Sequence, residues 1–505
     1  MLLFLALAGC EPAADVVPLD PPPVRGPLPP LAWTSSPEGV EVTTIQVPYD
    51  HAHPEAGTFP MRIGRAKHRF NMNYKGVILM NFGGPGADGV GYLPWFGSIL
   101  DSLRDDYDLV SFDVRGGGYA PDAEPLGCMD GELLDAVLDA YDGVGDETHI
   151  EAVGAAAKAW FDHCRDTNPK LVDHMGMNAW ADDMDTIREA LGVEKISYYG
   201  ASAGTGLGLT YAERHPDRVD RFVLDSTLDA YGGAYGVYKS QLDGIPVVTQ
   251  LWADWCAEDA TCAVHDDPEG AIAEVLARSS SEDPLEVDGR PLTFGRAAYG
   301  IGANLYSEYA WSWLGELLAA AREGDGTLLM DSSDGYFGRY PNEDGEIAYS
   351  TMTGISNLVW CADNVNPTTA ADIAAWTAAD GAALGPMAKL GGFDLAWCLE
   401  VPPTDPVDHP ATAAGTPPML MLQSTPPPPG ALDASAHHLP GRVWNPCGRG
   451  RHPLGRRWRA DARGAGGRGG GRGRAAVADL PRRLDRGGPR DRGPHLRPVR
   501  RGAEL

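Results

Sequence analysis

The sequence predicts a mostly parallel α/β fold, in which helices flank the sheet, with a mainly helical domain inserted into the chain. Continuous apolar runs at 76–82, 107–113 and 221–226 alternate with helical patterns. This alternation is typical of buried parallel strands and the helices that connect them. A strand, a sharp turn and a helix follow one another over 195–214, whereas helical patterns alone fill most of 229–410.

The turn at the centre of this pattern carries a serine. Gly-Ala-Ser-Ala-Gly at 200–204 joins a β-branched and aromatic run to a helical segment. A nucleophile elbow requires this order, because its serine has a strained backbone and its small neighbours let strand and helix approach closely. A glycine- and serine-rich loop is the alternative interpretation, but the flanking strand and helix favour the elbow. We predict Ser202 as the nucleophile.

A second glycine cluster follows the buried strand at 76–82. The sequence Gly-Gly-Pro-Gly at 83–86 fits either a simple turn or a loop that presents backbone N–H groups to a developing oxyanion. The serine downstream favours the second interpretation. We predict that Gly84 and Ala203, the residue after the nucleophile, form the oxyanion hole through their N–H groups.

The remaining elements surround this centre. Alternating segments at 40–47 and 59–67 predict antiparallel strands, and helices are expected at 92–103, 150–164 and 178–191. The last helix carries Asp182, Asp183 and Asp185, which we interpret as partners of the helix dipole and not as a metal or acid–base site. Arg115 follows the strand at 107–113 and is expected to bond nearby carbonyls or carboxylates, without a catalytic role.

The segment 229–410 is predicted to be a helical lid over the sheet. Four of its tryptophans could line a substrate pocket, but we favour core positions for them: Trp252, Trp255, Trp311 and Trp313. The sheet is expected to resume at 418–424. The predicted boundaries are 39–228 and 411–440 for the two parts of the sheet domain, 229–410 for the lid, and 441–505 for a tail rich in Arg, Gly and Pro.

The first residues predict export. Residues 1–10 form an apolar run that ends in Leu-Ala-Gly-Cys, which is similar to the end of a bacterial lipoprotein signal with Cys10 as the lipidated residue. The run is too short to span a bilayer. Residues 11–38 contain a proline-rich linker that is typical of an extended tether. We therefore expect a cell-envelope lipoprotein or a secreted protein, with a membrane contact only through the lipid.

The eight cysteines indicate an oxidising compartment. With Cys10 set aside, pairing of neighbours gives Cys128–Cys164, Cys256–Cys262 and Cys361–Cys398 and leaves one cysteine over, although the sequence alone leaves the connectivity open. Since neither CxxC pairs nor histidine clusters with zinc spacing occur, we predict no metal and no other cofactor.

The charge distribution argues against binding to nucleic acid. The net charge of −29 combines two opposite parts. The residues from Gly441 onward contain 18 arginines, no lysine and five acidic residues, a net charge of +13, so the preceding residues carry −42. Phosphate binding needs a basic footprint, which the acidic body lacks.

The motifs together resemble the α/β-hydrolase fold and, more narrowly, the secreted bacterial tripeptidyl-aminopeptidase-like hydrolases, which are related to proline iminopeptidases. The resemblance extends from about residue 40 to about residue 440 and rests on segments 83–86, 113–118, 182–192, 197–208, 211–216, 223–225, 360–363 and 397–398. This family usually has tyrosine where this chain has Ala203. Because the oxyanion donor there is a backbone N–H, the change need not abolish the chemistry.

The resemblance implies a Ser-Asp-His triad whose acid and base follow the strand at 418–424. That region departs from the family, because Pro426–Pro429 replaces the expected loop with its aspartate. The remaining candidates are Asp433 for the acid and His452 for the base. We favour a shifted reading frame as the origin of the tail, with a genuine basic arm or a degenerate C-terminus as alternatives. Resequencing the codons for Pro426–Pro429 tests this hypothesis.

The resemblance implies a serine exopeptidase that releases residues or short peptides from the N-termini of peptides. A carboxylate of the lid should pair with the substrate ammonium, and Asp363 is the candidate. The alternatives are a carboxylic-ester hydrolase of the same fold, and an inactive binding protein that lacks the triad acid. The expected partner is a peptide substrate, and the chain is expected to be a monomer.

Overall fold

A computed structural model describes residues 31–422, with gaps at 38, 71–73, 118–124, 229–233, 235, 238–240, 242–243, 365–368 and 408–410. Eight strands of this part form one sheet in the order β1-β2-β3-β5-β4-β6-β7-β12. Their bounds are β1 Thr34–Ser35, β2 Glu41–Pro48, β3 Thr58–Ala66, β4 Gly76–Asn81, β5 Tyr107–Phe112, β6 Ile196–Ala201, β7 Val219–Asp225 and β12 Leu420–Leu422. Two-stranded ribbons also occur, β8 Glu286–Val287 with β9 Arg290–Pro291, and β10 Arg339–Pro341 with β11 Ile347–Tyr349.

The sheet is parallel where the sequence predicts buried strands. The pairs β4–β5, β4–β6, β6–β7 and β7–β12 are parallel, whereas β2 and β3 form an antiparallel pair and β3 runs antiparallel to β5. Leu79, at the centre of β4, is fully buried between neighbours on both sides. The predicted α/β fold and the return of the chain to the sheet at β12 are therefore confirmed.

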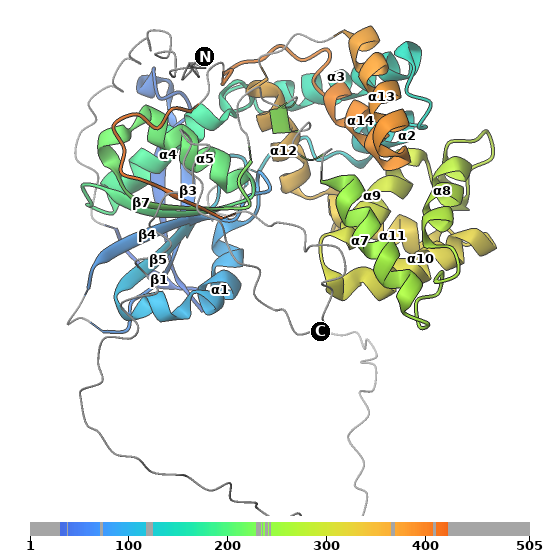
Figure 1. Ribbon diagram of the computed structural model, residues 1–505. Coiled ribbons are helices and arrows are strands. Elements are labelled where there is room, and N and C mark those ends of the chain that lie inside the picture. Colours follow the sequence, from blue (N-terminus) through green and yellow to red (C-terminus); the bar gives the residue numbers. More distant parts are fainter. Residues whose placement is uncertain are drawn as a thin grey trace, which may run out of the picture. The chain divides into compact units, whose positions relative to one another are not determined.

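Helices cover both faces of the sheet (Figure 1). Helix α1, Gly89–Ile99, packs on β3 and β5, and α5, Ala203–Arg214, packs on β6 and β7 beside α4, Met177–Ala190. Helix α1 begins three residues earlier than predicted because Asp88 caps it, accepting a hydrogen bond from Gly91 N at 2.6 Å. Its buried residues Val90 and Leu93 face an apolar cluster with Phe82.

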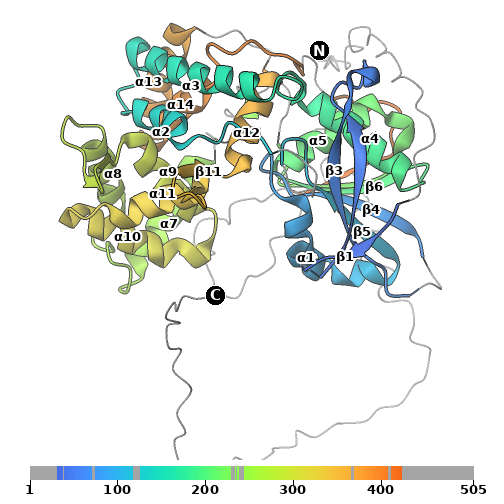
Figure 2. The ribbon, with the colours of Figure 1, turned by 180° about the vertical axis from the view of Figure 1, so that it is seen from behind.

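The helical region has contributions from two parts of the sequence. The predicted insertion supplies α7 Ile245–Glu258, α8 Pro268–Ser279, α9 Phe294–Leu305, α10 Trp311–Glu323, α11 Thr327–Phe337, α12 Thr351–Ala362, α13 Ala370–Leu384 and α14 Leu390–Ala396. Helices α2, Gly131–Ala140, and α3, Glu147–Thr167, lie between β5 and α4 in sequence but contact α9, α13 and α14 (Figures 1 and 2). The predicted sheet domain, 39–228, therefore includes two helices that pack in the helical region.

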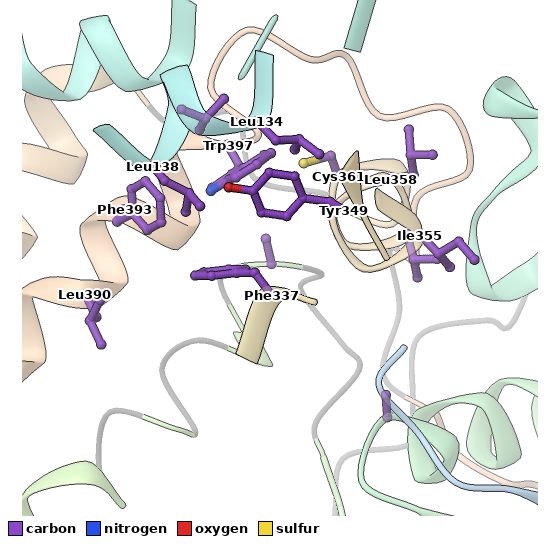
Figure 3. Close-up of a cluster of buried hydrophobic side chains, with 14 of the residues drawn as sticks. Leu134, Leu138, Phe337, Tyr349, Ile355, Leu358, Cys361, Leu390, Phe393 and Trp397 are labelled. Atoms are coloured by element: carbon purple, nitrogen blue, oxygen red, sulfur yellow. The ribbon is translucent and has the colours of Figure 1, made fainter. Parts of the chain in front are cut away.

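Aromatic and aliphatic side chains from both contributions share one core. Figure 3 shows Phe337, Tyr349, Phe393 and Trp397 close together, with Leu134 and Leu138 of α2 beside them. Tryptophans of the insertion also behave mostly as predicted. Trp252 is fully buried and donates its indole N–H to the carbonyl of Trp311, at 3.1 Å, and Trp311 is itself buried. Trp313, by contrast, is 43% exposed.

Three disulfides staple the described chain. Cys128–Cys164, Cys256–Cys262 and Cys361–Cys398 all form, which confirms the predicted pairing. The first bond ties the segment before α2 to α3, and the third ties α12 to the end of α14. Cys10 lies outside the described residues. Disulfides persist in oxidising compartments, so the bonds agree with the expectation of export.

Opening the third disulfide should destabilise the protein more than opening the second. The sequence separation is 37 residues for Cys361–Cys398 and six for Cys256–Cys262. Chain entropy then predicts that the free energy of unfolding falls by ~4 kcal/mol without Cys361–Cys398 and by ~2 kcal/mol without Cys256–Cys262. We expect this order in urea unfolding of the two Cys→Ser double variants. An equal loss in both would contradict the entropic explanation.

Candidate active site

Ser202 occupies a strained turn between β6 and α5. Its φ of 51° and ψ of −123° lie outside the regions that residues with a side chain prefer. Neighbouring hydrogen bonds hold it there: Ser202 N donates to Asp225 O of β7 at 3.0 Å, and Ser202 O accepts from Thr205 N at 2.9 Å and from Thr205 Oγ1 at 2.6 Å. The side chain is exposed. This geometry is that of the predicted nucleophile elbow.

Glycines on both sides of the serine allow the close approach that the turn needs. A Cβ at Gly200 would lie 2.4 Å from the carbonyl oxygen of Gly204, and a Cβ at Gly204 would lie 2.5 Å from that of Asn81. A Cβ at Gly208 would lie 2.7 Å from the ring of Tyr198. Real Cβ atoms do not tolerate such distances, so α5 can approach the sheet only because these residues are glycines.

The glycine loop after β4 lies directly against the elbow. Gly83 has a φ of +91°, and a Cβ there would meet Ala201 O at 2.7 Å and Ala203 N at 3.0 Å. Gly84 follows with a φ of +109°. The structure thus brings together the two segments that carry the predicted donors, Gly84 and Ala203. Ala203 is the first residue of α5, where N–H groups lack intrahelical acceptors and favour negative charge.

Polar side chains that the sequence analysis did not single out fix this loop at both ends. Asn81 Oδ1 accepts from Gly83 N at 3.0 Å where the loop begins. At its end, Asp113 Oδ1 accepts from Val90 N in the first turn of α1, at 2.9 Å. Burial, together with the neighbouring Asp88, raises the pKa of Asp113 to about 8. Isolated polar residues at strand ends are common, so the sequence offers little signal for these roles.

Helix α12 of the helical region also contacts the loop. Ser356 Oγ donates to the carbonyl of Pro85 at 2.6 Å. A Cβ at Gly86 would lie 2.8 Å from Cβ of Ile355, so the glycine is needed for this contact. Helix α12 therefore restricts the movement of the loop after β4.

A buried ionic network joins the segment after β5 to α4. The guanidinium of Arg115, fully buried, donates to both carboxylate oxygens of Asp183 at 2.6 and 2.9 Å and to the carbonyls of Tyr49 and His174. His51 Nε2 lies 2.6 Å from Asp183 Oδ1. Arg115 and His51 lower the pKa of Asp183 although burial alone would raise it. Arg115 thus meets a carboxylate, as expected. The predicted dipole role of Asp183 was wrong, because this residue lies beyond the first turn of α4 and pairs with side chains instead.

The other two aspartates of α4 also form pairs. Asp182 bonds Arg214 and His215, and Asp185 bonds Arg188. The pair of His215 and Asp182 does not serve Ser202, because His215 follows the last residue of α5. At ~1.5 Å per residue, this histidine lies roughly 20 Å along the helix from the serine.

The predicted acid and base cannot be placed. Asp433 and His452 both lie outside the described residues, so their assignment to the triad remains a prediction. The described site consists of the nucleophile and the loop that faces it. Among the described residues, no cluster of three or more His, Cys, Asp or Glu side chains could hold a metal ion. A search of the same residues finds no helix long and apolar enough to cross a membrane.

The burial of Asp363 is explained by contacts within the protein, without a substrate. It follows α12, is 2% exposed, and accepts a hydrogen bond from Met177 N, in the first turn of α4, at 2.8 Å. A Cβ at Gly176 would lie 2.7 Å from its carboxylate. Burial raises the pKa of Asp363, with a further contribution from Asp405. We infer that Asp363 links the helical region to the start of α4.

Comparisons with known proteins agree with the fold. The profile of the alpha/beta hydrolase fold family matches residues 76–241. The tripeptidyl aminopeptidases of Streptomyces coelicolor and Streptomyces lividans are each 27% identical over 314 residues, which cover 59% of this chain and 56% of each relative. The serine protease Hip1 of Mycobacterium tuberculosis H37Rv is 29% identical over 359 residues, covering 64% of this chain and 66% of that protein.

The strand order, the elbow and the matching profile define the class: the chain has an α/β-hydrolase fold. More narrowly, its curated relatives carry the names tripeptidyl aminopeptidase and serine protease Hip1. The chain spans about half to two thirds of the length of these relatives.

Replacing Gly83 with alanine should disrupt the site. The alanine would have to adopt the positive φ of Gly83, and its Cβ would collide with the backbone of the elbow. We expect a loss of about 2 kcal/mol in the free energy of unfolding, together with slower reaction of Ser202 with a fluorophosphonate. Gly97→Ala in α1 is the matched control, since its Cβ meets nothing within 4 Å. Equal behaviour of the two variants would argue against the contact.

Removing the guanidinium of Arg115 should destabilise the fold strongly. Arg115→Met leaves the carboxylate of Asp183 buried without its main partner, which typically costs about 3–5 kcal/mol. Lys158→Ala, which removes an exposed ion pair with Asp162 on α3, should change stability by less than about 0.5 kcal/mol. Denaturant unfolding measures both variants, and similar small losses would show that the buried pair contributes little.

Proposed function

We propose that this chain is a serine hydrolase that removes residues or short peptides from the N-termini of peptides through an acyl-enzyme. The observation that carries the proposal is the exposed Ser202 at a positive φ, with the loop that contains Gly84 packed against it. A serine in an ordinary loop would relax to an unstrained conformation, and strained residues of this kind cluster at functional sites. The same strain directs a nucleophile toward the C-terminal edge of the sheet.

The chemistry follows from these groups. Ser202 Oγ attacks the carbonyl carbon of the scissile bond, and its proton passes to a general base. The carbonyl oxygen becomes an oxyanion, and the N–H groups of Gly84 and Ala203 are our candidates for stabilising it. The C–N bond then breaks, the amine leaves with the proton, and water releases the acyl group from the serine. His452 is our candidate base and Asp433 the group that orients it.

The preference for peptides rests on the relatives and on the helical region. The relatives named tripeptidyl aminopeptidase and serine protease support a peptide substrate. The contacts of Ser356 and Ile355 with the loop after β4 support a role of the helical region in limiting access to Ser202. A lid that limits access would admit chain ends more readily than the interior of a folded protein.

Export to the cell envelope is part of the proposal. Three disulfides support an oxidising compartment. Lipidation of Cys10 would hold the protein at a membrane, and labelling of expressing cells with a radioactive fatty acid, with Cys10→Ser as the control, tests it. We propose that the protein acts as a monomer, without a metal or an organic cofactor.

Ser202 should react with a fluorophosphonate probe, and Ser202→Ala should not, as mass spectrometry of the labelled peptide will show. Tripeptidyl and aminoacyl amides should be hydrolysed, whereas their N-acetylated forms should not, because an exopeptidase needs the free amino end. Turnover of acyl esters without turnover of any amide would replace the proposal with an ester hydrolase. Absence of labelling in the folded chain would indicate an inactive binding protein.

A further inference from the structure

Helix α1 carries no charged side chain, although one of its faces is open to solvent. Trp95 is 59% exposed, Ile99 is 61% exposed, and Tyr92 is exposed as well. Their spacing of three and four residues places them on one face of the helix, opposite the buried Val90 and Leu93. Helix α12 also lacks charged residues, but none of its residues is exposed. Because a helix that is apolar all round is normally buried, the outer face of α1 is a candidate contact surface.

The apolar surface continues beyond the end of α1. Leu103 of the short helix η3, Asp101–Asp105, is exposed, and so is Phe70 in the segment after β3. A backbone hydrogen bond of 2.7 Å from Arg69 N to Arg104 O joins this segment to η3. The exposed apolar residues together form what we call the α1 patch: Phe70, Tyr92, Trp95, Ile99 and Leu103.

The indole of Trp95 is held in place by neighbouring rings. Its centroid lies 4.4 Å from that of Phe96, in an edge-on arrangement, and Phe96 stacks on Phe82 with centroids 4.2 Å apart. Phe82 belongs to the apolar cluster under α1. An exposed aromatic ring that already has a fixed position loses little conformational entropy on contact, which favours a role in binding.

The charges beside the α1 patch are balanced, unlike those of the whole body. Segments 67–75 and 101–106 contain four basic and three acidic residues, a net charge of +1, whereas residues 1–440 carry −42. Arg69, for example, forms an ion pair with Asp101. The negative surface of a membrane would repel most of the acidic body but not this part of it. Basic residues beside an apolar helix face that carries Trp and aliphatic side chains are typical of helices at a membrane surface.

The chain enters the described structure beside the same helix. Strand β1 pairs with the start of β2 through Thr34 and Val42, and Val42 packs against the apolar cluster that contains Leu93 of α1. Figure 2 shows β1 and α1 at the same end of the sheet domain. Cys10, the predicted lipidation site, precedes Leu31 by 21 residues, and an extended proline-rich tether of that length spans at most roughly 65 Å. A lipid at Cys10 and the α1 patch can therefore engage one bilayer.

We propose that the α1 patch lies on the surface of a lipid bilayer and forms a second membrane contact besides the lipid at Cys10. Trp95 and Tyr92 lie at the level of the headgroups, where rings with a polar group are favoured, and Ile99 reaches the acyl boundary. The amphipathic rings and the entry of the tether beside α1 favour a bilayer over a second copy of the chain. This inference goes beyond the proposed function, because membrane contact does not require a reactive serine.

Contact through α1 leaves the elbow accessible. Successive side chains of a strand point to opposite faces of a sheet. Met80 of β4 belongs to the cluster with Leu93 of α1, whereas Leu79 belongs to the core that contains Leu207 of α5. Helices α1 and α5 thus cover opposite faces, and Ser202 directly precedes α5. A chain bound to a bilayer through α1 can therefore still receive a substrate at Ser202.

The test uses the full chain with Cys10→Ser, so that no lipid contributes to binding. Flotation with vesicles of phosphatidylcholine and phosphatidylethanolamine measures the partition coefficient, and these lipids carry no net charge that would attract the arginines of 441–505. The parent should float with the vesicles. Trp95→Ser combined with Ile99→Ser should lower the partition coefficient at least tenfold, because two large apolar side chains leave the contact. The matched control is Tyr309→Ser on η6, Glu308–Ala310, which removes a 91% exposed ring and should bind like the parent.

A second measurement locates the contact. Phosphatidylcholine with brominated acyl chains quenches tryptophans that enter a bilayer, so the fluorescence of the bound parent should fall. Trp95→Phe keeps an apolar ring and should still bind, but most of the quenching should be lost. Trp313→Phe removes an exposed tryptophan of α10 and should leave the quenching unchanged.

The proposal is overturned if the parent does not float, or if the double variant floats as well as the parent. Binding that requires added phosphatidylglycerol and is equal in both chains would assign it to residues 441–505 and also reject the patch. Sedimentation velocity without vesicles tests the other occupant: a parent dimer that becomes a monomer in the double variant rejects the bilayer in favour of a second copy.

Thermal unfolding shows whether the double variant is folded. If it is not, Trp95→Phe decides, and undiminished quenching in that variant rejects the contact. Fluorophosphonate labelling separates this proposal from the proposed function. A chain whose Ser202 does not react can still float with vesicles, and a chain that does not float can still be labelled.

Discussion

The close approach of two backbone segments, the elbow at Ser202 and the loop after β4, is the constraint on which the candidate site depends. The strained turn persists because its surroundings oppose relaxation from several directions. Ser202 N is held by β7, Thr205 binds the serine carbonyl, and a Cβ at Gly83 would strike the elbow. The strand order makes this contact possible, because β4 and β7 lie on either side of β6. The loop after β4 can therefore reach Ser202 from one side, and Asp225 O of β7 can accept its N–H from the other.

Support for this contact comes from both the sheet domain and the helical region. Asn81 and Asp113 fix the ends of the loop from within the sheet domain, and Ser356 of α12 holds its middle. Asp363, two residues beyond the Cys361 disulfide, connects the same helix to α4. The helical region is thus joined to the site through a helix that is itself covalently stapled. A change in the packing of α12 would therefore be transmitted to the glycine loop that faces Ser202.

The sequence predicted the elements that depend on local pattern. Apolar runs located β4, β5, β6 and β7, and small residues around Ser202 located the elbow, because both signals lie within a few consecutive residues. Partners distant in sequence were less accessible. Amphipathic periodicity shows that α3 buries one face, but not that α13 and α14 cover it, so the predicted sheet domain, 39–228, included this helix. Arg115 was expected to meet a carboxylate, yet its partner Asp183 lies 68 residues away. Asp433 and His452 remain predictions.

The enclosed carboxylates show how one residue type serves different purposes in a single chain. Asp183 and Asp135 each meet arginines, and these pairs lower their pKa values. Asp363 meets the start of a helix, where N–H groups partly compensate its charge. Asp394 meets only a tyrosine hydroxyl in the described structure. Stability alone would favour an arginine or an apolar residue at such a position, since an uncompensated charge is costly to bury.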